Sequence, residues 1–113
     1  MTNSRDSLRS FRPKVEKFEH GGQTFHVRGL SGAGRARYLE LCRAGGDAGP
    51  SMAKVVALGL CEEDGSLTYS VDNDKDVTEI GDVDGTVLQA IVFKLYQVSG
   101  LATQAIENAS KNS

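Results

Sequence analysis

A pair of apolar ladders near the C-terminal end constrains the fold of this chain most. The large apolar side chains between residues 83 and 96 recur every fourth position in two adjacent rows: Val83, Val87, Ile91 and Leu95, then Leu88, Val92 and Tyr96. Residues four apart lie on one face of an α-helix. We therefore predict a long amphipathic helix over 84–99, ended by Gly100, whose broad apolar face packs into the core or against a partner.

The N-terminal part of the chain has a different pattern. Apolar and polar residues alternate over 24–28, which is typical of a half-buried strand. Gly21 and Gly22 separate this run from another β-prone run at 14–19. A glycine pair between two such runs favours a tight hairpin turn, so we predict two antiparallel strands here.

The segments between the hairpin and the long helix give weaker signals. We expect a helix that Ser31 caps and the Gly45-Gly46 pair ends, because serine is a favoured N-cap and glycine a favoured stop. Apolar spacing and turn residues predict the remaining elements: a helix from Ser51 to about Cys61, a strand over 67–71, a short helical turn at 77–80 and a weak helix over 101–109. The predicted fold class is α+β, a small N-terminal β-hairpin or sheet followed by a mostly helical C-terminal part.

Length and polarity limit the organisation of the chain. At 113 residues and 12.1 kDa it has the size of one domain. We expect residues 1–13, which are polar and without periodicity, to be a flexible arm, and residues 14–113 to form the domain. A membrane span needs about 18 consecutive apolar residues, and the sequence has no such run. The N-terminus has no apolar stretch typical of a signal peptide, which predicts a cytoplasmic protein.

Charge is distributed unevenly along the chain although the net charge is −2. Through Lys54 there are ten Lys or Arg and five Asp or Glu, whereas from Val55 onward there are three and ten. The basic part has no dense run of cations interleaved with aromatic residues, so we do not expect nucleic-acid binding. Such a bipolar chain is compatible with head-to-tail self-association.

The glycine-rich segment 29–34 resembles a dinucleotide-binding loop only superficially. When Gly32 and Gly34 are taken as the first two glycines of the motif, the third position is Arg37. We interpret the segment as a helix entry. The acidic run that starts at Asp72 similarly fails as a calcium loop, because its sixth and twelfth positions are Val77 and Val83.

The remaining candidate chemistry is also sparse. His20 and His26 could form a metal pair across the hairpin, but no third ligand stands at a fixed spacing, so surface histidines are the simpler interpretation. Cys42 and Cys61 lack the spacing of a metal or redox motif and are interpreted as packed side chains. The sequence therefore predicts no catalytic residue, no cofactor and no metal site.

The order of these elements carries a family resemblance. The features concerned are a hairpin, an Arg-rich helix, an apolar helix running into Glu62-Glu63-Asp64-Gly65, then Glu79-Ile80-Gly81, the amphipathic helix, Ser99-Gly100-Leu101 and the ending Lys111-Asn112-Ser113. Over residues 14–113 this layout resembles the tail assembly chaperones of long-tailed bacteriophages and prophages. The resemblance implies a non-enzymatic protein that binds the tape-measure protein and keeps it soluble in the host cytoplasm until tail-tube subunits assemble around it. It also implies that the protein is absent from the mature virion.

The resemblance leads to a set of expected partners and contact residues. The partners are the tape-measure protein and, as further options, the tail-tube subunit and a second copy of the chain. We expect the C-terminal helical part to carry the contact through five apolar side chains: Leu88, Ile91, Leu95, Leu101 and Ile106. Two alternatives stay open, a structural tail or head–tail joining subunit retained in the virion, and a small nucleic-acid-binding regulator that uses the basic half.

Overall fold

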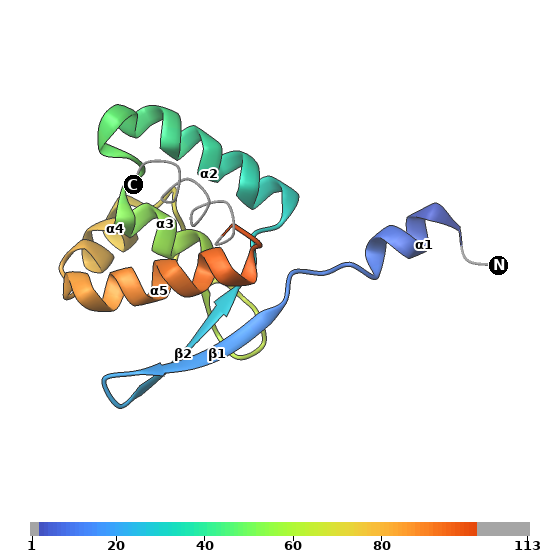
Figure 1. The fold of residues 1–113 in the computed structure, drawn as a ribbon, viewed down its shortest axis with the longest axis horizontal. Coiled ribbons are helices and arrows are strands. Elements are labelled where there is room, and N and C mark those ends of the chain that lie inside the picture. Colours follow the sequence, from blue (N-terminus) through green and yellow to red (C-terminus); the bar gives the residue numbers. More distant parts are fainter. Residues whose placement is uncertain (1–2, 102–113) are drawn as a thin grey trace, which may run out of the picture.

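The computed structural model describes residues 3–101 and has a small antiparallel sheet followed by helices (Figure 1). The elements in chain order are α1 (Ser4–Arg9), β1 (Val15–His20), β2 (Gln23–Arg28), α2 (Gly32–Gly45), the 3₁₀ turn η1 (Gly46–Ala48), α3 (Met52–Gly59), β3 (Leu60–Cys61), α4 (Asp74–Gly81) and α5 (Gly85–Val98). The sheet order is β1-β2-β3. The predicted α+β class, with a small N-terminal sheet and a mostly helical remainder, is confirmed.

The hairpin of β1 and β2 forms where the sequence predicts it. Its register runs from Val15 opposite Arg28 to His20 opposite Gln23. Gly21 and Gly22 form the turn with φ angles of 59° and 79°. A two-residue turn with two positive φ angles matches the twist of the flanking strands, which explains why glycine occupies both positions.

Strand β3 corrects the predicted extent of the second helix. We expected that helix to reach about Cys61, but α3 ends at Gly59. Leu60 is already extended, with φ −65° and ψ 127°, and it pairs with Val27 of β2. Pairing to a neighbouring strand thus overrides the helical spacing of the apolar run, and it gives the sheet its third strand.

The predicted strand over 67–71 is wrong. Leu67 forms a single bridge with Cys61, after a turn in which Gly65 has a φ of 90°. The backbone N–H of Ser70 then donates to the Asp76 carboxylate at 2.9 Å, so the chain turns directly toward α4. Tyr69 and Val71 pack against the core from a loop instead of extending the sheet, whereas Leu67 is exposed.

Side-chain caps define where the helices begin. Ser31 accepts a hydrogen bond from the Gly34 N–H at 3.1 Å, which confirms it as the N-cap of α2. Asn73 and Asp84 cap α4 and α5 in the same way. Helix α4 is therefore a full eight-residue helix, longer than the helical turn predicted at 77–80. Helix α5 agrees closely with the helix predicted over 84–99.

The core is built around α3. Helices α4 and α5 both pack on α3, and α5 also packs on β1 and β2 (Figure 1). The buried cluster comprises Val27, Leu41, Val55, Val56, Ala57, Leu58, Ile80, Leu88, Ile91 and Leu95. Every residue of α3 from Val55 to Gly59 is buried, so this short helix is enclosed on all sides. The apolar ladders of α5 therefore face this core.

Residues 3–14, which we call the arm, lie outside that core. The sequence predicted no regular structure there, whereas Ser4–Arg9 form helix α1, which begins with Asn3 accepting a hydrogen bond from the Asp6 N–H at 2.8 Å. No residue of α1 is buried. Figure 1 shows the arm projecting away from the body of the domain.

Candidate functional site

The side chains predicted to bind a partner are mostly enclosed by the domain itself. Leu88, Ile91 and Leu95 expose 5%, 3% and 0% of their surface. They pack against α3 and the sheet, so they cannot contact a partner while the domain keeps this fold. The physical reason for this correction lies in α3. Because this short helix is buried in the core, α5 has to cover it, and the apolar ladders of α5 form that contact.

The other two predicted contact residues follow α5. Leu101 is half-buried, and its backbone N–H donates to the Tyr96 carbonyl at 2.7 Å, which completes the turn after the helix. Ile106, and the helix predicted over 101–109 apart from its first residue, lie outside the described residues. Leu101 is thus the member of the predicted set that reaches the described surface.

The outward face of α5 presents a side chain that the ladder analysis did not single out. Phe93 is 58% exposed, on the face opposite Ile91 and Leu95. Its neighbours one turn away on the same face are Gln89 and Gln97, both exposed. In the sequence, Phe93 differs from the neighbouring apolar residues only in that it belongs to neither of the two apolar ladders.

The glycine-rich helix entry is packed against the end of α5. A Cβ on Gly29 would lie 3.2 Å from the Val98 carbonyl oxygen, so glycine permits a close approach of the two backbones. The Leu30 N–H donates to the Ser99 hydroxyl at 3.0 Å, and the Arg35 guanidinium donates to the Ser99 carbonyl. The segment therefore serves the helix entry and the packing of α5, as the interpretation from sequence expected.

The acidic segment at 72–76 holds together the loop that leads into α4. Asp72 forms an ion pair with Arg37 of α2 at 2.7 Å. Asn73 caps α4 by accepting from the N–H groups of Lys75 and Asp76. Hydrogen bonds within the fold thus account for these polar side chains, and among the described residues no group of three or more His, Cys, Asp or Glu could hold a metal ion.

The two hairpin histidines do not converge. In the observed register His26 lies opposite Lys17, whereas His20 lies opposite Gln23. Residues directly opposite each other point to the same face, and successive residues along a strand alternate between faces. His20 and His26 therefore point to opposite faces of the hairpin, which excludes the metal pair considered from the sequence.

Two fully or partly buried titratable groups, Cys61 and Tyr38, have raised pKa values. Burial raises the pKa of the Cys61 thiol, so the reactive thiolate is disfavoured. The Tyr38 hydroxyl lies 3.1 Å from that of Tyr96, and burial together with this contact raises the pKa of Tyr38. The two tyrosine rings meet edge to face and connect α2 with α5, which is a packing role.

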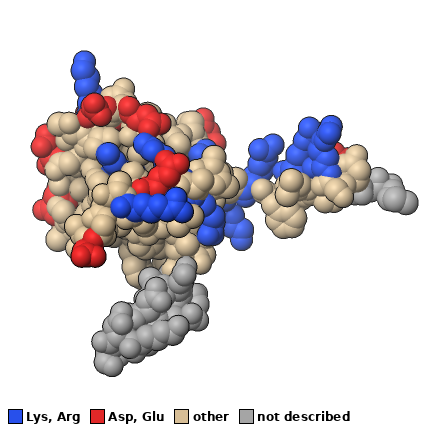
Figure 2. Space-filling model, turned by 90° about the horizontal axis from the view of Figure 1, so that it is seen from above, with Lys and Arg blue, Asp and Glu red and all other residues tan. Residues whose placement is uncertain are grey.

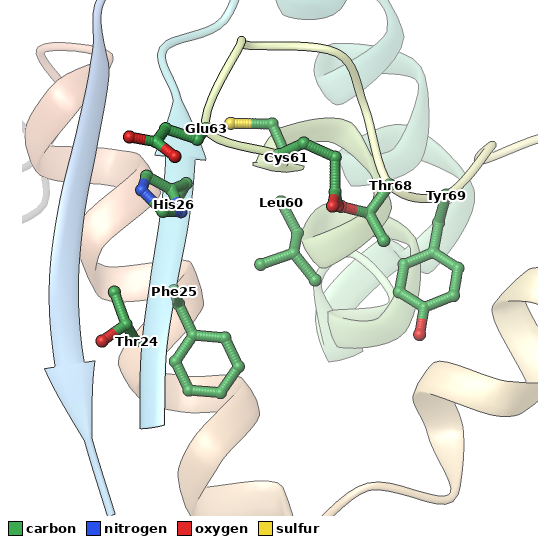
Figure 3. A pocket seen from close by; sticks show the side chains of 9 residues that line it. Thr24, Phe25, His26, Leu60, Cys61, Glu63, Thr68 and Tyr69 are labelled. Carbon is green, nitrogen blue, oxygen red and sulfur yellow. The ribbon is translucent and has the colours of Figure 1, made fainter. Parts of the chain in front are cut away.

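One cavity combines apolar and acidic side chains. This β2 cavity, of about 390 Å³, opens between β2 and the segment that follows α3. Its lining residues are Thr24, Phe25, His26, Leu60, Cys61, Glu62, Glu63, Thr68 and Tyr69. Figure 3 shows Phe25 on β2, Leu60 on β3 and Tyr69 on the segment that follows, on different sides of the cavity. The cavity offers an apolar surface beside two carboxylates, a combination suited to an aromatic or aliphatic group with a neighbouring cation.

The distribution of charge separates the arm from the body. Lys and Arg gather on the arm, whereas almost all of the Asp and Glu visible in Figure 2 lie on the body. The arm contains the cations Arg5, Arg9, Arg12 and Lys14 and the single acid Asp6. The uneven charge of the sequence thus becomes a basic projection attached to a body that carries most of the acidic residues.

Within residues 3–101, no helix has both the length and the apolar character required to cross a membrane. No protein-family model, no curated protein and no solved structure matches the chain significantly.

Proposed function

We propose that this protein is a non-enzymatic tail assembly chaperone that binds the tape-measure protein and keeps it soluble during tail assembly. The proposal starts from the resemblance in element order over residues 14–113. It is supported by the α+β architecture and by interior groups whose environments suppress reactivity, as at Cys61 and Tyr38.

The observation that carries the proposal is the outward face of α5. Its apolar ladders are used in the core, yet Phe93 remains more than half exposed at the centre of the opposite face. Aromatic side chains dominate the energetics of protein interfaces, because they bury a large area and lose little conformational entropy. A rigid helix that presents an aromatic side chain between glutamines suits contact with another amphipathic helix, the expected form of a tape-measure protein.

The corrected contact surface therefore consists of Phe93 and the half-buried Leu101, in place of the enclosed ladder residues. Phe93 occupies the middle of α5, and Leu101 follows its C-terminal end. Both residues belong to the C-terminal helical part. The region predicted to make the contact is therefore kept, and the side chains assigned to it are different.

Co-purification tests this assignment. The full chain is co-expressed with the tape-measure protein of the same tail-gene cluster, and the complex is captured through a tag on the latter. Phe93→Asp is expected to abolish co-purification, while Gln89→Asp, one turn away on the same face, leaves it intact. Both variants should retain the wild-type circular dichroism spectrum, since neither side chain is buried. Undiminished capture of a folded Phe93→Asp protein would refute the assigned surface.

Particle composition distinguishes a chaperone from a structural subunit. Mass spectrometry of purified virions is expected to detect tail-tube and tape-measure peptides and to lack peptides of this protein. Stoichiometric peptides of this protein in the particle would favour the structural tail or head–tail joining subunit instead.

A further inference from the structure

We propose that the arm of one copy of this chain docks into the β2 cavity of a second copy, giving head-to-tail self-association. This inference does not rest on the proposed chaperone function. It starts from two large apolar side chains of the arm, Leu8 and Phe11, which are 74% and 82% exposed. Both are left uncovered by the domain to which they belong.

The arm presents its apolar and basic side chains as two adjacent stripes. The Phe11 N–H donates to the Leu8 carbonyl at 3.1 Å, which continues the helical turn beyond α1 and keeps the two apolar side chains on one side. Arg5 and Arg9 lie four residues apart on α1 and form the neighbouring stripe, and Arg12 follows the helix as a further cation of the arm. A partner for the arm must therefore offer an apolar surface with acidic groups beside it.

The β2 cavity offers that combination. Phe25, Leu60 and Tyr69 supply the apolar surface, and Glu62 and Glu63 are exposed at its edge. Within residues 3–101 neither carboxylate forms an ion pair, and the same holds for the arm cations. Docking would bring these opposite charges together at the rim of the contact, where they favour association and set its orientation.

The backbone beside the cavity is also available. Within the described part of the chain, β3 pairs with β2 at His26 and Val27 alone. The edge of β2 at Gln23–Phe25 therefore has no neighbouring strand on that side. Residues 11–13 of the arm have no regular secondary structure, so they can lie extended along this edge while Phe11 enters the cavity.

Two further surface cavities fit the arm less well. The one along α4, of about 410 Å³, is lined by Asp74, Lys75, Thr78, Glu79 and Asp82 and contains no large apolar side chain. The one between α2 and the loop before α4, of about 300 Å³, has apolar side chains, but its single acid, Asp72, is already paired with Arg37, so it offers no free carboxylate to a basic arm. Of the three cavities, the β2 cavity alone offers both an apolar surface for Leu8 and Phe11 and free carboxylates for the arginines of the arm.

Geometry favours a second copy over the arm's own domain. The arm enters β1 at Val15, opposite Arg28, whereas Thr24 at the cavity lies opposite Glu19 near the other end of the hairpin. In the sheet order, β1, which the arm enters, lies on the other side of β2 from β3. The arm moreover points away from the body in Figure 1. Because arm and cavity are different surfaces, the contact is heterologous and can repeat from copy to copy.

Sedimentation velocity of the full chain over a range of concentrations tests the proposal. The wild type is expected to form dimers and larger species, which dissociate as salt screens the rim charges. An arm variant, Phe11→Asp, and a cavity variant, Thr24→Arg/Glu63→Arg, should each raise the dissociation constant about tenfold or more, because each removes one side of the contact. All of these positions are exposed, so both variants should retain the wild-type melting temperature.

Mixing the two variants gives the decisive result. The arm variant keeps an intact cavity and the cavity variant keeps an intact arm, so their mixture should form a dimer and nothing larger. Phe93→Asp, which changes an exposed phenylalanine elsewhere, should associate like the wild type. A wild type that stays monomeric, a Phe11→Asp protein that associates normally, or a mixture that stays monomeric would each overturn the proposal; the last two outcomes would place the contact on other surfaces.

Discussion

The contact between α3 and α5 makes Gly59 a sensitive test of the packing. Gly59 is the buried last residue of α3, and a Cβ placed there would lie 2.5 Å from Leu95 Cδ1 and 3.1 Å from Leu95 Cγ. Leu95 is fully enclosed, so its side chain has no free space into which it could rotate. Gly59→Ala must therefore shift one helix relative to the other.

The expected magnitude is a balance of two effects. Overpacking a close-packed core costs about 1–3 kcal/mol. Replacing glycine by alanine in a helix contributes up to about 1 kcal/mol in the opposite direction, and less at the last residue of the helix. The net prediction is that Gly59→Ala lowers the free energy of unfolding by about 1–2 kcal/mol, measured by urea denaturation followed by circular dichroism.

Gly81 provides a matched control. It is also the last residue of an eight-residue helix, α4, but a Cβ there would meet nothing within 4 Å. Gly81→Ala should therefore leave stability unchanged or raise it by up to about 1 kcal/mol. A Gly59→Ala protein as stable as Gly81→Ala would refute the close approach of α3 and α5.

A double-mutant cycle separates the steric effect from other causes. Leu95→Ala alone should cost about 2–5 kcal/mol, because it leaves a cavity at an enclosed site. In that background the clash at Gly59 is gone, so adding Gly59→Ala should become neutral or stabilising. Additive effects of the two substitutions would show that the methyl group at position 59 does not meet Leu95.

Three further predictions concern other parts of the domain. Ile91→Ala should lower the free energy of unfolding by about 2–5 kcal/mol in the same urea assay, since Ile91 is buried; a change near zero would place it at the surface. Ser99→Ala should cost about 1–3 kcal/mol, because the Leu30 N–H loses its acceptor in a partly buried site. Hydrogen bonds from Thr86 lower the pKa of Asp84, so its contribution to stability is present above the ordinary aspartate pKa of about 3.9 and is lost as the pH falls through the lower folded value. The difference in urea midpoint between wild type and Asp84→Asn should therefore be constant above the ordinary aspartate pKa and shrink as the pH falls below it, and a difference that does not shrink in this acid range would contradict this origin.

Local signals in the sequence predicted much of the fold. The spacing in α5, the glycine pair between β1 and β2, and the capping serine of α2 each act within a few residues, so each could be recognised without knowledge of the tertiary structure. Strand β3 could not, because Leu60 and Cys61 become a strand only by pairing with β2, more than thirty residues earlier in the chain. The alternation over 67–71 misled because, in the described structure, this segment pairs with a strand at Leu67 alone, through a single bridge to Cys61 of β3.

The functional surface was harder to predict than the fold. An apolar ladder is compatible with a helix face that packs into the core and with one that forms an interface. No feature of the sequence distinguishes the two. What decides the matter here is α3, whose complete enclosure uses the ladder of α5. Phe93 and Phe11 gave no signal as candidates, because a single aromatic residue outside the apolar ladders acquires meaning only once its exposure is known.

The hydrogen bonds around Ser99 have a consequence for how the chain folds. They join Ser99 to Leu30 and Arg35, residues 69 and 64 positions earlier, while the hairpin closes over only a few residues. Closing such a long loop precedes most of the stabilisation gained from the core, so the hairpin is expected to form early and α5 to dock late. Until α5 docks, α3 lacks the part of its apolar cover that α5 provides. The nascent chain is thus exposed to aggregation for most of its synthesis, and it becomes a stable domain only when its last described helix is complete.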